Sequence, residues 1–199
     1  VGLQNEWTAL PNDKNIKFSV ARRRLSFGWR HRTLRASIIA LSMFWALAQV
    51  FLLVFQDVSG SQTVNTMQNY LAFAVVGLVV GSIIAAHNSK DFIETGFVPL
   101  GMIGASLCMF LIPFFVHPVA LSILYTAIGI FGGMFLVPVN ALLQYNTRPN
   151  NSGWVIALAN MIQALVLVVF LFIYSSLVRY TSLEPSYYFI GLALISVGV

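Results

Sequence analysis

Charged side chains are almost absent from most of this sequence. After Arg35, the remaining 164 residues contain seven charged side chains, and each lies in a short break between long apolar stretches. Ordinary soluble domains carry about 25% charged residues, against 9% here. Burying a charge in hydrocarbon is costly. Charges that occur only in the short segments between long apolar runs therefore indicate that the runs cross a lipid bilayer. The seven are Asp57, Lys90, Asp91, Glu94, Arg148, Arg179 and Glu184.

Cysteine and the usual catalytic motifs are also missing. Cys108 is the single cysteine and lies within an apolar run, which excludes a disulfide framework or a paired-cysteine metal site. The sequence has no glycine-rich nucleotide fingerprint, no phosphate loop and no nucleophile elbow. The apolar runs contain no Asp, Glu, Lys, Arg or His. We therefore expect a protein that is not an enzyme and that has no metal site and no cofactor.

What the sequence does contain is six apolar runs, which predict an all-α membrane protein. A helix needs roughly 20 apolar residues to cross a bilayer. Five runs are about that long, and a sixth extends from residue 187 to residue 199, the last residue of the sequence. Its 13 residues cover only about 20 Å as a helix, so we expect a truncated last helix and a piece of a larger protein. The predicted spans are 36–55, 70–86, 96–116, 119–143, 153–178 and 187–199.

The basic residues predict the orientation of these spans. Eight of the eleven Lys and Arg residues precede residue 36. If residues 1–35 form a cytoplasmic basic linker, Lys90 and Arg148 also fall inside and Arg179 alone falls outside. Cytoplasmic connections of membrane proteins are rich in Lys and Arg. The net charge of +5 therefore indicates membrane orientation rather than a nucleic-acid partner.

Neutral polar side chains inside two runs are candidates for a substrate cavity. Trp45 and Gln49 lie about 14 and 20 Å along the first span from residue 36. Asn160 and Gln163 share one face of the fifth span, about 10 and 15 Å from its start. Buried amides need polar partners, so we hypothesise that these four residues line a cavity near the bilayer centre. The alternative is that Asn160 and Gln163 only join two helices by hydrogen bonds.

Other residues of the spans suggest a gate and helix contacts. Asn140 and Gln144 lie one turn apart at the inner end of the fourth span, either as an inner gate or as a helix cap. Gly77 and Gly81 in the second span, and Gly129 and Gly133 in the fourth, form small-residue stripes that allow helices to pack closely. Such stripes form either a fixed contact between two helices or a surface along which the two helices can slide. Pro113 and Pro138 lie inside spans, where a proline removes a backbone hydrogen bond.

Four stretches resemble a known transporter family. Residues 135–144 and 153–160 resemble corresponding stretches of lysophospholipid transporters of the major facilitator superfamily, and residues 93–101 resemble the start of the third helix in the same half. The stretch around Phe44 and Trp45 resembles that family's seventh helix. Trp154 stands where the family has arginine, so a phosphate-contacting role is not carried over to that position. The matching positions are Pro138, Asn140, Ala141, Leu142, Leu143, Gln144, Gly153, Val155, Ile156, Ala157 and Asn160.

The resemblance implies a fold, a function and partners. It implies the second six-helix half of a major facilitator bundle, whose partner is the missing N-terminal half of the same transporter. It also implies transport of a lysophospholipid-like amphiphile by alternating access across a bacterial inner membrane. Two alternatives stay open: a major facilitator transporter of soluble metabolites or drugs, and the membrane anchor of a fused phospholipid acyltransferase. A pure membrane scaffold is a further alternative.

Overall fold

The computed structural model describes residues 32–59, 64–89, 96–115, 117–147, 152–181 and 185–198. These residues are helical with short connections and contain no strand, which confirms the prediction of an all-α fold. The proposed basic linker lies outside the described residues, apart from positions 32–35. The helices are α2 (Arg32–Ser59), α3 (Val64–Asn88), α4 (Phe97–Leu111), the short 3₁₀ helix η1 (Ile112–Phe114), α5 (Pro118–Tyr145), α6 (Ser152–Tyr180) and α7 (Pro185–Val197).

Five of these segments are long and apolar enough to cross a membrane. They are the described segments Arg32–Asp57, Gln68–Asn88, Phe97–Phe114, Pro118–Tyr145 and Gly153–Tyr180. The apolar part of α7, Tyr187–Ser196, is shorter. The 28 residues of α5 extend about 42 Å, which exceeds a hydrocarbon core of about 30 Å. The protein is therefore an integral membrane protein.

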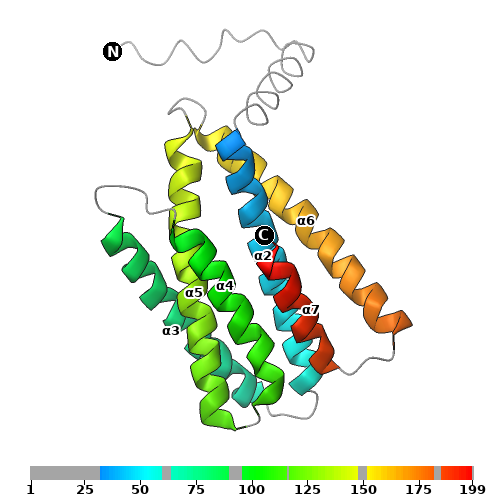
Figure 1. Ribbon diagram of the computed structural model, residues 1–199. Coiled ribbons are helices and arrows are strands. Elements are labelled where there is room, and N and C mark those ends of the chain that lie inside the picture. The colour runs from blue at the N-terminus through cyan, green and yellow to red at the C-terminus, as the bar shows by residue number, and fades with distance from the viewer. Residues whose placement is uncertain are drawn as a thin grey trace, which may run out of the picture.

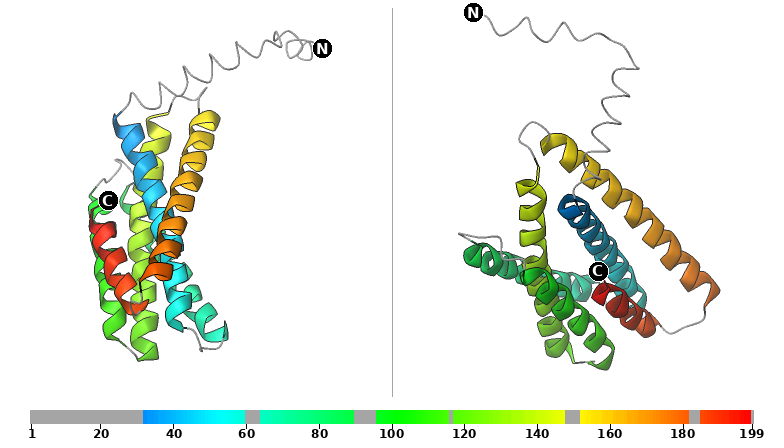
Figure 2. Two further views of the ribbon diagram at one scale, coloured as in Figure 1. Left: turned by 90° about the vertical axis from the view of Figure 1, so that its right-hand side faces the viewer. Right: turned by 45° about the horizontal axis from the view of Figure 1, so that its top comes forward.

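The helices form a bundle with α2 near its centre. Helix α2 packs against α5, α6 and α7, while α5 also packs against α3 and α4. Helices α2 and α6 run in the same direction, and α6 diverges from the rest of the bundle along its length (Figure 1). The left view of Figure 2 shows α4 and α7 together on one side of the bundle.

The two prolines within predicted spans have different effects. Pro113 lies in η1, where the α-helix has given way to a 3₁₀ turn that ends at Phe114. A proline cannot donate the backbone hydrogen bond that would continue the α-helix. Pro138 lies inside α5, which continues through it to Tyr145. The first proline therefore ends a helix and the second does not.

Helices α3 and α5 are interlocked through glycines. A Cβ atom added at Gly81 would lie 2.7 Å from the carbonyl carbon of Ile130, and one at Gly133 would lie 2.6 Å from the backbone nitrogen of Ser82. At Gly77, an added Cβ would lie 2.9 Å from the carbonyl carbon of Thr126. Contacts this short to backbone atoms leave no room for a side chain. The two backbones thus approach as closely as glycine allows, which is how small residues join helices in membranes.

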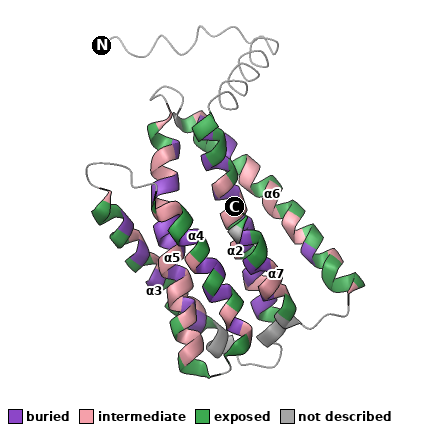
Figure 3. Ribbon diagram, in the orientation of Figure 1, coloured by how far each residue is buried: buried purple, intermediate pink, exposed green. Residues whose placement is uncertain are grey.

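Burial follows the position of each helix in the bundle. Buried residues occur along most of α2, whereas α3 and α6 present mainly exposed residues (Figure 3). The exposed residues of α6 include large apolar side chains such as Leu165, Val168 and Phe172. Apolar surface of this kind is stable against lipid or against another membrane helix, and not against water.

Candidate functional site

An apolar cavity lies between α2, α3 and α5. Its volume is about 360 Å³, and its lining is almost wholly apolar. Cavities that hold small ligands begin at about 300 Å³. The lining residues are Phe44, Trp45, Leu47, Ala48, Phe51 and Leu52 of α2; Leu71, Ala74, Val75 and Leu78 of α3; Met102, Ala105 and Met109 of α4; Ile128, Gly129, Gly132 and Leu136 of α5; and Ser196 of α7.

The cavity opens between α2 and α3 and has its floor on α4 and α7. The lining side chains Trp45 and Val75 are 42% and 59% exposed, whereas Met102, Met109 and Ser196 are buried. The Ser196 hydroxyl donates to the Ala193 carbonyl at 2.9 Å and is paired with the Ser106 hydroxyl. The polar group in the floor is thus already hydrogen-bonded, and the cavity has an apolar interior.

Aromatic rings form the walls at both ends of the cavity. Phe44 stacks on Phe135 with ring centroids 5.2 Å apart and meets Trp45 edge-on at 5.7 Å. Towards the C-terminal end of α2, Phe51 belongs to an aromatic cluster that joins α2, α3, α5 and α7. The members of this aromatic cluster are Phe51, Phe55, Tyr70, Tyr125 and Phe189.

Tyr125 is the buried centre of the aromatic cluster. Its side chain is 0% exposed, and its hydroxyl has no hydrogen-bond partner in the part of the chain that the structure describes. Its ring lies 5.0 Å from that of Phe55 and 5.4 Å from that of Tyr70. Of the cluster, Phe51 lines the cavity, and its ring packs against the buried ring of Tyr125.

The four residues predicted to share a polar cavity lie on two neighbouring helices. Trp45 and Gln49 are exposed on α2, Asn160 is exposed on α6, and Gln163 is half-buried there. Of the four, Trp45 lines the apolar cavity. Contact between the three amides and a common cargo stays a prediction.

A hydrogen bond between α2 and α6 sets their relative depth. The Tyr174 hydroxyl of α6 donates to the Asp57 carboxylate near the end of α2. Because the two helices run in the same direction, counting back from this pair brings Gln163 to about the depth of Ala46, next to Trp45. Counted along the chain, Ala46 and Gln163 are therefore equally far from this pair, on adjacent helices.

The two residues predicted as an inner gate lie in the last turns of α5. The Asn140 amide donates to the Leu136 carbonyl at 2.9 Å, one turn earlier on the same helix, and Asn140 is half-buried. Gln144 is exposed. The Asn140 side chain thus bonds to the backbone of its own helix. Its role in a gate, and that of Gln144, stays a prediction.

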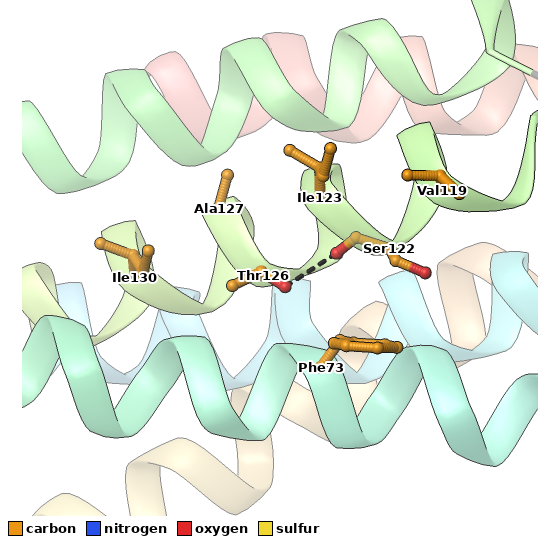
Figure 4. A pocket seen from close by; sticks show the side chains of 7 residues that line it. All are labelled: Phe73, Val119, Ser122, Ile123, Thr126, Ala127 and Ile130. Carbon is orange, nitrogen blue, oxygen red and sulfur yellow. Dashed lines mark hydrogen bonds between the residues drawn. The ribbon is translucent and has the colours of Figure 1, made fainter.

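A second hollow lies on the outside of the α3–α5 pair (Figure 4). It is lined by Phe73 of α3 and by a face of α5 that includes Ser122 and Thr126. The Ser122 hydroxyl donates to the Pro118 carbonyl at 3.0 Å, and the Thr126 hydroxyl donates to the Ser122 carbonyl at 2.8 Å. Since both hydroxyls are satisfied within their own helix, this hollow offers a ligand little beyond apolar contact.

Sequence patterns did not reveal the apolar cavity. Its residues come from five helices, and most are the ordinary Leu, Ala and Phe of membrane segments. A faint signal lies in the small residues Ala48, Ala74 and Gly132, which all line the cavity. Among the described residues, no group of three His, Cys, Asp or Glu side chains is placed to bind a metal.

Comparison with known proteins gives a family and relatives. The family model described as Major Facilitator Superfamily matches residues 4–197. A protein of Klebsiella pneumoniae named lysophospholipid transporter LplT is 31% identical over 153 residues, which are 74% of this chain and 38% of that protein. Proteins of the same name from Cronobacter sakazakii and Escherichia coli K12 are 32% and 29% identical, over 76% and 86% of this chain and 39% and 42% of their own lengths. No solved structure matches the chain.

Proposed function

The chain belongs to the major facilitator superfamily, and from that premise we propose that it forms one half of a transporter for a lysophospholipid-like amphiphile. It spans about 40% of the length of the curated relatives it matches. The other half of the transporter is the proposed partner. The two halves would rock about a shared central cavity, which opens to one side of the membrane at a time.

One feature of the structure carries the proposal for the cargo: the bundle holds an apolar cavity, and α2, which forms part of its lining, carries the exposed amide residue Gln49 one turn after the lining residue Trp45. The Trp45 ring is part of the cavity wall, and Gln163 lies on the adjacent helix at about the same depth. An amphiphile needs an apolar surface for its chain and polar groups for its head. This arrangement supports an amphiphilic cargo over a fully polar one, and the names of the relatives point to the same class.

Each candidate residue has a proposed role. Gln49, Asn160 and Gln163 supply amide donors and acceptors to the polar head of the cargo. Trp45 provides a flat apolar wall between these amides and the cavity. Asn140 and Gln144 serve the inner gate at the end of α5, which the positive-inside rule places at the cytoplasmic face together with residues 1–35.

Replacement of the α6 amides tests this function. In the full-length protein reconstituted in vesicles, the double substitution Asn160→Leu and Gln163→Leu should lower lysophospholipid uptake by about tenfold or more, since each lost hydrogen bond to a charged or polar head contributes about 1–3 kcal/mol. The control is Asn88→Leu, at the exposed end of α3. Unchanged uptake at equal protein level would remove the two amides from the site.

Competition separates the cargo classes. We expect lysophospholipids to inhibit transport of a labelled lysophospholipid, and sugars and cationic drugs to leave it unchanged. Inhibition by drugs or metabolites, with no effect of lysophospholipids, would favour the transporter of soluble compounds instead.

A further inference from the structure

We propose that the apolar cavity between α2, α3 and α5 holds the acyl chain of the cargo, and that Gly132 sets the length and bulk of chain that fits. This inference rests on the proposed transport of an amphiphile. It assigns to the cavity a part of the cargo that the amide residues do not bind.

The chemistry of the cavity favours a hydrocarbon occupant. The Ser196 hydroxyl in its floor is held by Ser106 and by the Ala193 carbonyl, so no free polar group is offered to water. An apolar lining of this kind favours apolar groups over water. The methionines of the floor, Met102 and Met109, have flexible side chains that adapt to an irregular or mobile occupant.

One residue, Trp45, belongs both to the cavity lining and to the proposed polar site. Trp45 lines the opening of the cavity, and Gln49 follows it one helical turn later on α2. A cargo whose head is held by the Gln49 or Gln163 amide would bring the start of its chain to the Trp45 ring. The cavity that Trp45 lines is also lined by Ala48, Gly132 and the α4 methionines, so the chain would meet apolar side chains there.

Gly132 is a lining glycine at which volume can be added without moving a helix. A Cβ atom at Gly132 would lie 3.4 Å from Cζ of Phe44 and 3.6 Å from Cδ1 of Leu78, which are ordinary packing distances. Gly129, one turn earlier, also lines the cavity, but a Cβ there would lie 2.7 Å from the backbone nitrogen of Leu78. A larger residue at 132 therefore fills the cavity, whereas a larger residue at 129 forces α3 away from α5.

Chain-length selectivity tests the inference. The full-length transporter in vesicles is supplied with octanoyl or palmitoyl lysophosphatidylethanolamine, and uptake of the two is compared. We expect Gly132→Val to lower the ratio of palmitoyl to octanoyl uptake by about tenfold, because a long chain must be forced into a filled cavity. The matched control is Gly191→Val on α7, where an added Cβ meets nothing within 4 Å, and it should leave the ratio unchanged.

The outcomes distinguish this inference from the proposed function. If the unaltered protein transports neither lysophospholipid, the proposed function fails. If it transports both and Gly132→Val leaves the ratio unchanged at equal protein level, the function stands and the assignment of the cavity is overturned.

A second measurement does not depend on a variant that must fold. A lysophosphatidylethanolamine with a photoreactive group at the end of its chain should label Met102 or Met109 of the unaltered protein, both of which are buried in the cavity floor. Labelling confined to exposed residues of α6, such as Phe172, would overturn the inference.

Discussion

Single glycines differ sharply in this bundle according to what faces them. Gly81 of α3 faces the backbone of Ile130, with its added Cβ at 2.8 Å from the Ile130 Cα. Gly132 faces the side chains of Phe44 and Leu78 at ordinary distances, and Gly153 at the start of α6 faces nothing within 4 Å. Gly81 thus allows two helices to touch, Gly132 leaves space in the cavity, and Gly153 has no packing role.

Replacement of Gly81 by alanine should destabilise the protein. The added methyl group cannot be accommodated unless α3 moves away from α5, and overpacking of this kind costs about 1–3 kcal/mol, occasionally more. We expect a clear fall in the thermal unfolding temperature of the detergent-solubilised protein. In contrast, Gly153→Ala should leave it unchanged or raise it slightly, since alanine is the better helix former. Equal effects of the two substitutions would contradict the interlocked packing of α3 and α5.

Among the long helices, α6 makes the least contact with the rest of the bundle. It packs mainly against α2, and most of its surface is exposed apolar side chain. Near its end, the Tyr174 hydroxyl donates to Asp57 of α2, and the Tyr174 ring meets Tyr188 of α7 edge-on at 5.6 Å. This tyrosine therefore holds the end of α6 to two helices.

Removal of the Tyr174 hydroxyl should loosen α6. The substitution Tyr174→Phe keeps the ring contact and deletes the hydrogen bond to an exposed carboxylate, for which we expect a loss of about 1 kcal/mol in the free energy of unfolding. Thermal or denaturant unfolding of the solubilised protein measures it. Tyr180→Phe, at the exposed end of the same helix, is the control and should have no measurable effect. A stability of Tyr174→Phe equal to that of the control would show that α6 is held by apolar packing alone.

At the scale of the whole molecule, the distribution of basic residues predicts one orientation in the membrane. Ten of the eleven Lys and Arg residues fall on one side if residues 1–35 are cytoplasmic, counting eight in that segment together with Lys90 and Arg148. The ends of the long helices then alternate between the two faces, with the end of α2 outside and the end of α3 inside.

Cysteine accessibility measures that orientation. In a Cys108→Ala background, a membrane-impermeant maleimide added to intact cells should label Gln56→Cys at the end of α2 and leave Asn88→Cys at the end of α3 unlabelled. Permeabilised cells should show labelling of both. Labelling of Asn88→Cys alone in intact cells would reverse the orientation and with it the position of the proposed inner gate.

The sequence predicted the class of fold well, and of the four residues that it proposed for a substrate cavity, Trp45 lines the apolar cavity. Helix formation and membrane insertion depend on local composition, so the apolar runs were sufficient to predict an all-α membrane bundle. The cavity depends on how five helices cross, which local patterns do not contain. Gly129 and Gly132 look equivalent in the sequence, and they differ because one faces a backbone and the other faces a ring. The end of α4 is intermediate: Pro113 marked a disturbance but did not specify a 3₁₀ turn.

The interlocked glycines of α3 and α5 have a mechanical consequence. That pair is rigid because any relative shift would drive backbone into backbone, while α6 is tied to α2 by the Tyr174 hydroxyl. Helix α2 meets α5 through two sets of rings: the Phe44–Phe135 stack, and the contacts of Phe51 and Phe55 with Tyr125. A shift of the α2–α6 pair against the α3–α5 pair would therefore widen or narrow the lumen by sliding rings past one another rather than backbone past backbone.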